Sequence, residues 1–331
     1  MFKNVKPVLI VMISLISLIV ITAIGFQTDL IILDPKGPVG LIQKDLIMFS
    51  IYFMLAIVIV VFVLFTFMVI KYRDRKNFSS KDYKPDMHGS TKLEIMWTII
   101  PIIIVTALSI PNAKALYALK EPPKSSVNKE PIVIYATAVD WKWIFSYPEA
   151  NIETVNYVNV PEDRPILFKV TAADSMASFW VPQIGGQIYG MPGMVNDLYL
   201  QADEPGVYAG RNSNFTGKEM TNQKFNFVAL KEEEYQEWVE KTQENAPKLV
   251  EKTYEKLMFP GSVDEMTFSS THLKFVDHGK NSEYAMKIRE KYGVEVKGIK
   301  VKTNGNDEKT NEEVDSKNEK KSTNNGSHSN H

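Results

Sequence analysis

The sequence of 331 residues predicts an α+β membrane protein, in which a transmembrane helix hairpin precedes an antiparallel β-sandwich and a short helical region. Three observations predict this fold. Two long uncharged runs flank a basic loop at residues 71–94, and short aromatic and β-branched runs fill residues 131–230. A stretch rich in Glu and Lys then follows, with apolar residues at loosely helical spacing. Each block therefore indicates a different environment: lipid for the first, water for the others.

Composition excludes several classes of function. The formal net charge of −1 gives no basic patch or stripe of the kind that binds nucleic acid. The chain contains no cysteine. Disulfides, thiolate zinc sites, iron–sulfur clusters, a cysteine nucleophile and lipidation of an N-terminal cysteine are therefore all excluded.

The N-terminal residues 1–27 predict a signal peptide or a signal anchor. Lys3 and Lys6 precede an uncharged run that extends from residue 7 to residue 27. The small residues of Ala23-Ile24-Gly25 could be recognised by signal peptidase, but the run exceeds the roughly 7–15 residues usual for a signal peptide. Cleavage and retention both stay open. Residues 28–45 are expected to form an extracytoplasmic linker.

Residues 46–70 and 95–113 are predicted to span the membrane. The first run has 25 uncharged residues, and a helix of that length measures about 37 Å, which is enough to cross the hydrocarbon core with tilt. The second run has 19 residues and includes Pro101 and Pro111, which membrane helices tolerate better than soluble helices do.

The charges of the loop at residues 71–94 predict its side of the membrane. Between residues 71 and 92 it holds seven basic residues against three acidic ones, so the positive-inside rule places it in the cytoplasm. The basic N-terminus agrees with this orientation. Residues from 114 onward are then extracytoplasmic, beginning with a linker at residues 114–130.

The extracytoplasmic part is predicted to contain a sandwich, a helical region and a tail. Strand-like runs lie at residues 132–137, 141–147, 166–172, 198–202, 206–209 and 225–230. No helical crossover pattern separates them, which favours antiparallel pairing. Residues 231–301 are expected to be helical, with two amphipathic helices broken near Pro247. Residues 302–331 are polar and charged, and we expect them to be disordered.

Four segments carry a resemblance to a known family. Residues 94–101 read Glu-x-x-Trp-Thr-x-x-Pro, and residues 141–143 read Trp-x-Trp. Residues 174–182 read Asp-Ser-Met-Ala-Ser-Phe-Trp-Val-Pro with a Pro-Gly turn downstream, and residues 205–213 read Pro-Gly-Val-Tyr-Ala-Gly-Arg-Asn-Ser. In this order, behind a helix hairpin, they resemble subunit II of the haem-copper oxidases over residues 37–230. The resemblance implies a cupredoxin-like, Greek-key sandwich at residues 131–230.

The cytochrome c oxidases of that family hold a binuclear copper centre in this sandwich. Matched by position, its five ligands, two histidines, two cysteines and a methionine, fall on Ala177, Met220, Asn212, Thr216 and Gln223, and a glutamate between the cysteines falls on Asn214. Amides do not replace thiolates that bridge two copper ions. The resemblance therefore implies that this chain has no metal or other cofactor and no catalytic residue of its own.

Two further segments resemble the menaquinol oxidases of Gram-positive bacteria. They are Lys36-Gly37-Pro38-Val39 and the Gly-Arg-Asn-Ser-Asn-Phe run at residues 210–215. This resemblance implies a structural subunit of a complex that oxidises quinol, reduces oxygen to water and pumps protons. Subunit I would bind the haem, the copper and most of the quinol, and other subunits and membrane lipid would be further partners. The chain would be a multi-pass protein of the bacterial cell membrane; which quinol is used stays open.

Glu94 is the one residue for which the resemblance implies a part in proton transfer. It would stand at the entry of a proton channel leading into subunit I, where an ionisable side chain can bind and release protons. The alternative is a solvated acid in the first turn of a helix, favoured there by the helix dipole. For the whole chain, the alternative function is an independent membrane-anchored cupredoxin-like binding module or copper carrier.

Overall fold

The computed structural model of this chain describes residues 30–71, 89–126 and 129–294. The predictions for the N-terminal segment, for most of the loop at residues 71–94 and for the tail at residues 302–331 lie outside these residues. A second unit, Glu295–His331, also lies outside them. Every structural statement below concerns the described residues.

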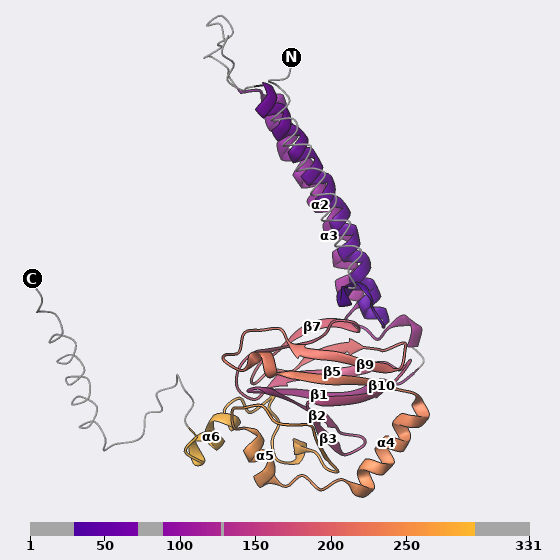
Figure 1. Cartoon of the computed structure of the whole chain (residues 1–331), viewed down its shortest axis with the longest axis vertical. Coiled ribbons are helices and arrows are strands. Elements are labelled where there is room, and N and C mark those ends of the chain that lie inside the picture. Colours follow the sequence, from indigo (N-terminus) through magenta and orange to yellow (C-terminus); the bar gives the residue numbers. More distant parts are fainter. Residues whose placement is uncertain (1–29, 72–88, 127–128, 295–331) are drawn as a thin grey trace, which may run out of the picture. The chain divides into compact units, whose positions relative to one another are not determined.

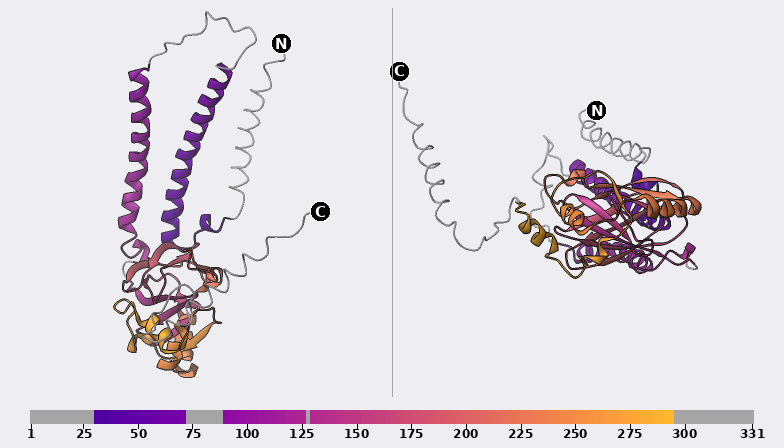
Figure 2. Two further views of the ribbon diagram at one scale, coloured as in Figure 1. Left: turned by 90° about the vertical axis from the view of Figure 1, so that its left-hand side faces the viewer. Right: turned by 90° about the horizontal axis from the view of Figure 1, so that it is seen from below.

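Two long helices precede the sheets (Figure 1). After the short 3₁₀ helix η2 (Ile31–Leu33), α2 covers Pro38–Lys71 and α3 covers Thr91–Ala118. Both are long and apolar enough to cross a membrane, and they contact each other (Figure 2). Apolar side chains project outward along both helices; Phe65 is 58% exposed and Trp97 is 63% exposed. Such a surface requires lipid or protein around it rather than water.

Five serine and threonine hydroxyl groups inside the two helices are satisfied within their own helix. Ser50 and Thr66 of α2 donate to the carbonyl oxygens of Leu46 and Phe62, at 2.8 and 2.6 Å. In α3, Thr98, Thr106 and Ser109 likewise donate to the carbonyl four residues back. Because lipid offers no hydrogen-bond partner, this bonding makes the hydroxyls compatible with the membrane interior.

The N-terminal end of α2 is built into the sandwich. Val39 is 4% exposed and belongs to its hydrophobic core, and the Gly40 amide donates to the Ile184 carbonyl at 3.0 Å. At Gly37 any Cβ would overlap the carbonyl oxygen of Gln201. Only glycine permits the backbones to approach this closely. The first turn of α2 is thus part of the extracytoplasmic core.

We predict that Gly37→Ala lowers stability by about 1–3 kcal/mol, because the added methyl group must push apart two backbones that cannot both relax. The measurement is the thermal unfolding midpoint of the detergent-purified chain, followed by circular dichroism. Leu41→Ala, which truncates a side chain that is 46% exposed four residues further on, is the control and should leave the midpoint unchanged. Equal midpoints for Gly37→Ala and the wild type would contradict the close packing.

The sandwich consists of two sheets. The six-stranded sheet has the order β11-β3-β2-β1-β5-β8 and the five-stranded sheet has the order β4-β10-β9-β6-β7. The strands are β1 (Ile132–Val139), β2 (Lys142–Tyr147), β3 (Ile152–Val155), β4 (Tyr157–Pro161), β5 (Ile166–Ala172), β6 (Ala177–Val181), β7 (Gly185–Gly190), β8 (Asn196–Leu200), β9 (Gly206–Asn212), β10 (Lys224–Leu230) and β11 (Met266–Phe268). The predicted sandwich is confirmed.

Strand pairing within the sandwich is mixed. Most neighbours are antiparallel, but β1 pairs with β5 in parallel and β10 pairs with β4 in parallel. A parallel pair requires a crossover connection. Here the chain makes it by passing through the other sheet: β4 lies between β3 and β5 in sequence but belongs to the second sheet. The absence of helical crossovers therefore did not exclude parallel neighbours.

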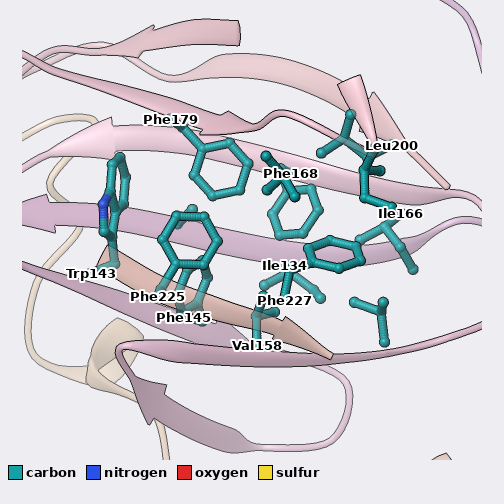
Figure 3. Close-up of a cluster of buried hydrophobic side chains, with 14 of the residues drawn as sticks. Ile134, Trp143, Phe145, Val158, Ile166, Phe168, Phe179, Leu200, Phe225 and Phe227 are labelled. Atoms are coloured by element: carbon teal, nitrogen blue, oxygen red, sulfur yellow. The ribbon is translucent and has the colours of Figure 1, made fainter. Parts of the chain in front are cut away.

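Aromatic side chains fill the space between the sheets (Figure 3). Phe179 and Phe225 stack with ring centroids 5.1 Å apart, and Trp143 meets Phe179 edge to face at 5.3 Å. All three are at most 3% exposed. Aromatic pairs of this geometry contribute about 0.5–1.5 kcal/mol each beyond the area that they bury.

The C-terminal region packs against the sandwich and confirms the predicted C-terminal helices. It comprises α4 (Glu232–Asn245), α5 (Glu251–Leu257), the 3₁₀ helix η6 (His272–Lys274) and α6 (Tyr284–Lys291), and Pro247 lies between α4 and α5. Strand β11 extends the larger sheet by pairing with β3. Leu249, Tyr254 and Ile288 join Val139 and Ile144 of the sandwich in a second buried cluster. Two further 3₁₀ turns are η4 (Lys124–Ser126) and η5 (Met220–Asn222).

Candidate functional site

The family's copper-ligand positions lie together where β6, β9 and β10 meet. Ala177 begins β6, Asn212 ends β9 and Gln223 immediately precedes β10. Asn214 and Thr216 lie in the loop after β9, and Met220 begins η5 in the same connection. The fold therefore gathers these residues as the family resemblance implies, although their side chains differ from those of a copper centre.

A buried pair of amide side chains occupies this position. Asn212 and Gln223 are 3% and 1% exposed, and Asn212 Nδ2 donates to Gln223 Oε1 at 2.8 Å and to Thr216 Oγ1 at 3.0 Å. Asn212 Oδ1 accepts from the backbone amides of Ser178, at 2.8 Å, and Asn214, at 2.9 Å. We call Asn212 and Gln223 the amide pair.

The second amide of the pair is bonded just as fully. Gln223 Nε2 donates to the carbonyls of Lys142 and Val139, at 3.3 and 3.5 Å, and Gln223 Oε1 accepts a second, longer contact from Thr216 Oγ1 at 3.4 Å. Each side-chain oxygen of the pair thus has two donors and each side-chain nitrogen has acceptors. Buried polar groups are normally satisfied in this way.

The chemistry of these residues does not fit a copper centre. The amide oxygens already accept hydrogen bonds, amide nitrogens have no lone pair to donate, and the methyl group of Ala177 offers no ligand atom. Among the residues that the structure describes, no group of three or more His, Cys, Asp or Glu side chains is placed to hold a metal ion. The site is therefore filled by two amide side chains that hydrogen-bond to each other.

We predict that Asn212→Ala destabilises the chain by about 1–3 kcal/mol, because it leaves two backbone amides without their acceptor and removes the shorter of the two hydrogen bonds to Gln223 Oε1. The midpoint of thermal unfolding, measured by near-ultraviolet circular dichroism in detergent, should fall by several degrees. Asn222→Ala, at an exposed residue of the same loop, is the matched control. If the two variants unfold at the same temperature, the amide pair does not stabilise the site.

A buried ion pair joins the site to α6. Arg289 Nη2 donates to Asp174 Oδ2, the two side chains are 3% and 6% exposed, and Arg289 Nε donates to the Met258 carbonyl at 2.6 Å. The same Asp174 oxygen accepts from the Asp140 amide at 3.2 Å. Asp140 in turn accepts from the Ser175 hydroxyl. Burial, together with the nearby Asp174 charge, raises the pKa of Asp140.

Lys142 connects the same strand ends to α5. It is 1% exposed, and its Nζ donates to the carbonyls of Phe259, Leu257 and Asp140 at 2.7, 3.1 and 3.2 Å. Burial lowers the pKa of Lys142 to about 8, although the Asp174 charge opposes this shift. The ammonium group lies at the C-terminal end of α5, where the helix dipole favours a cation.

The buried Lys142 makes stability depend on pH. Its pKa is about 8 in the folded chain and 10.5 ordinarily, so the unfolded chain binds more protons between these values. Stability should therefore rise with pH in this window, by up to about 1.4 kcal/mol per pH unit. We predict that Lys142→Met abolishes this rise while the exposed control Lys256→Met keeps it. Urea unfolding at pH 7.5, 9 and 10 checks this; parallel curves for wild type and Lys142→Met would refute it.

A second buried polar cluster lies at the junction with η6. Glu153 Oε2 accepts from the His272 amide at 2.7 Å and from the Ser146 hydroxyl at 2.9 Å, and it lies 2.8 Å from His272 Nδ1. All three residues are at most 1% exposed. Ser146 and Glu153 meet the same imidazole nitrogen, so this is not the chain of nucleophile, base and orienting acid that a hydrolase needs. The cluster fixes η6 to β2 and β3.

His278 completes this junction as a neutral side chain. Its Nε2 lies 2.6 Å from the hydroxyl of Tyr254, whose ring stacks on His272 with centroids 4.5 Å apart. Burial, and secondarily the nearby His272, lowers the pKa of His278 to about 3. His278 therefore carries no charge at neutral pH.

Glu94 and Trp141 are the other residues that the sequence singled out. Glu94 lies exposed in the first turn of α3, away from the amide pair; its amide donates to the Ser90 carbonyl at 3.0 Å, and Thr98 Oγ1 donates to the Glu94 carbonyl at 2.9 Å. Trp141 Nε1 donates to the Thr216 carbonyl at 2.9 Å, and its ring lies against Gly217.

Sequence reasoning missed the charged residues that support the site. Lys142 and Asp174 lie within recognised motifs, yet nothing local signals that their partners are carbonyls and an arginine more than one hundred residues later, at Arg289. His272 shows no ligand spacing in the sequence, and its partner Glu153 is 119 residues away. The one signal available in the sequence was Lys142, a charged residue within a strand that is predicted to be buried.

Comparison with known proteins identifies relatives of this chain. Residues 33–114 match the family "cytochrome c oxidase subunit II, transmembrane domain", and residues 149–226 match its periplasmic domain. "Quinol oxidase subunit 2" of Bacillus subtilis is 54% identical over 92% of this chain and 93% of its own length. The Bacillus cereus protein of the same name is 50% identical over 78% and 89%. The solved periplasmic domain of cytochrome oxidase subunit II from Bradyrhizobium japonicum is 26% identical, covering 34% of this chain and 93% of that one, with a TM-score of 0.33.

Proposed function

This chain belongs to the quinol oxidase subunit 2 family, and from this membership we propose that it is subunit II of a respiratory quinol oxidase. The complex oxidises quinol, reduces oxygen to water and pumps protons. The chain itself is a structural subunit. Its relatives of the same name match most of its length, so the membership covers the helix pair as well as the sandwich.

The amide pair is the observation that carries this function. A subunit that receives electrons through copper needs thiolate and imidazole ligands, whereas Asn212 and Gln223 satisfy each other's side chains. Electrons therefore do not pass through this chain. We propose that quinol donates electrons directly to haem in subunit I, which holds the haem and copper, and that subunit I and other subunits are the partners of this chain.

The helix pair and the extracytoplasmic domain support the proposed location. Among the described residues, two helices are long and apolar enough to cross a membrane and a periplasmic-type domain follows them, which supports a membrane-anchored chain with that domain outside. We place it in the bacterial cell membrane as a multi-pass protein with its C-terminal domain extracytoplasmic.

We further propose that Glu94 lines the entry of the proton channel on the cytoplasmic side. Its position in the first turn of α3 supports this, since this end of the helix follows the basic loop. We predict that Glu94→Gln lowers quinol-driven oxygen uptake several-fold at unchanged haem content, because the amide cannot bind and release a proton. Glu121→Gln, beyond the other end of α3, is the control and should have full activity. If Glu94→Gln has full activity, Glu94 takes no part in proton transfer and is only an acidic residue in the first turn of a helix.

The complex itself tests the proposed function. The tagged chain is purified from its native membrane in mild detergent and assayed for haem spectra, metal content and oxygen uptake on quinol and on reduced cytochrome c. We expect haem, copper only at the haem site, and uptake that depends on quinol and ignores cytochrome c. A haem-free preparation, or copper bound by this chain, would instead indicate the independent cupredoxin-like module.

A further inference from the structure

The end of α3 that joins the sandwich (Figure 2) carries several lysines. Lys114, Lys120 and Lys124 are exposed, and Glu121 is the one acidic residue between residues 114 and 129. The ion pairs of the described residues all lie elsewhere in the chain. In the proposed orientation this end of α3 lies outside, where the positive-inside rule does not favour an excess of lysine. The excess therefore calls for a partner.

The length of α3 places these lysines at the level of lipid headgroups. Glu94 and Lys114 bound the uncharged part of the helix. At about 1.5 Å per residue they are about 30 Å apart, which is the thickness of the hydrocarbon core of a bilayer. When Glu94 lies at one surface of that core, Lys114 lies at the other, next to the lipid phosphates. Lys120 follows less than two helical turns further on.

One face of α3 presents an aromatic ring together with these cations. Tyr117 follows Lys114 by three residues, so the two side chains lie on the same side of the helix. Lys120 Nζ lies 5.6 Å from the centroid of the Tyr117 ring. Tyr117 is 69% exposed, whereas Ala115 is 8% exposed. The face with Lys114 and Tyr117 is thus turned away from the rest of the described chain.

We propose that Lys114, Tyr117, Lys120 and Lys124 bind the phosphate group of an anionic phospholipid in the outer leaflet of the membrane. We call these four residues the outer lysine site. The inference rests on the proposed location of the chain in the membrane. Ammonium groups attract a phosphate as point charges, and amphipathic tyrosine rings favour the headgroup region. Because several lysines act together, the site favours an anionic lipid over a zwitterionic one.

A lipid fits this site better than a free phosphate ion does. Apolar side chains continue from the cations along α3, with Leu116 60% exposed and Ile110 54% exposed. A free anion would meet only the lysines and would leave this apolar surface uncovered. A phospholipid places its phosphate among the lysines and its acyl chains against the apolar residues. The site therefore combines the two kinds of contact that one lipid molecule offers.

Quenching of tryptophan fluorescence by tail-brominated phospholipids tests the site. The reporter chain carries Tyr117→Trp and Trp97→Phe, so position 117 holds the one tryptophan of α2 and α3. The full-length chain is reconstituted in mixed vesicles of phosphatidylcholine and phosphatidylglycerol, one of which is brominated. We expect phosphatidylglycerol to quench position 117 several-fold more effectively than phosphatidylcholine does. Added inorganic phosphate should leave this preference unchanged; its loss would identify a site for free anions and overturn the proposal.

Charge-matched variants of the reporter chain separate the site from general attraction to the membrane. Lys114→Gln with Lys120→Gln should remove the preference for phosphatidylglycerol. The control, Lys252→Gln with Lys256→Gln, changes two exposed lysines of α5 and should keep it. Equal quenching by the two lipids in the reporter chain, or a preference that survives the first pair of changes, would overturn the proposal. Absence of quenching by either lipid would instead refute the membrane location.

The purified oxidase complex provides a second readout. Lipids that co-purify with the tagged full-length chain from its native membrane are quantified by mass spectrometry, together with haem. We expect Lys114→Gln with Lys120→Gln to retain several-fold less phosphatidylglycerol per chain than the wild type does, at unchanged haem content. Loss of haem at unchanged lipid content would overturn the proposal in favour of an acidic protein surface. Absence of haem from the wild-type preparation would refute the proposed function, and the lipid measurement would still decide the site.

Discussion

The hydrogen bond between the side chains of Asn212 and Gln223 is the constraint on which the functional end of the sandwich depends. It joins the last residue of β9 to the residue before β10, and through the remaining lone pairs and N–H groups of the two amides it reaches the Ser178 amide, the Thr216 hydroxyl and the Lys142 carbonyl. In a copper-binding relative, a metal ion and its ligands would hold these strand ends together. Here buried amides do so, and they need no bound ion. The positions of the strand ends are therefore fixed by hydrogen bonds between side chains.

The residues around the amide pair extend this constraint to the C-terminal region. Lys142 donates to carbonyls at the end of α5, and Asp174 pairs with Arg289 of α6. Buried charges are costly unless they are paired and hydrogen-bonded, so each of these side chains requires its partner to be in place. The C-terminal helices are therefore held by the same strand ends that the amide pair organises. These two polar contacts, together with the apolar cluster around Tyr254, hold the C-terminal helices against the sandwich.

Segments that are long or rich in bulky side chains could be predicted from the sequence. Short strands, and contacts between residues far apart in the sequence, could not. The apolar run of α2 and the aromatic strand at Trp143 stand out because they are long or dense in bulky side chains. Strand β7 was missed by its local pattern, since Gly185, Gly186 and Gly190 make up half of its six residues. The family resemblance assigned Asn212 and Gln223 to one site, but their mutual hydrogen bond depends on side-chain geometry that spacing does not encode. The contacts of Lys142 with Leu257 and of Arg289 with Asp174 could not be predicted, because each joins residues more than one hundred positions apart.

The two ends of the extracytoplasmic domain have opposite requirements, and this explains the distribution of its glycines and polar residues. At the membrane side, Gly37 and Gly40 remove side chains so that α2 can enter the core, which couples the helix rigidly to β7 and β8. At the amide pair, polar side chains are added, and their hydrogen bonds hold the loop after β9 to the strand ends. The first turn of α2 and the loop after β9 are therefore both held firmly to the sandwich. A subunit whose function is structural requires this property, because it positions other subunits by offering contact surfaces that do not move.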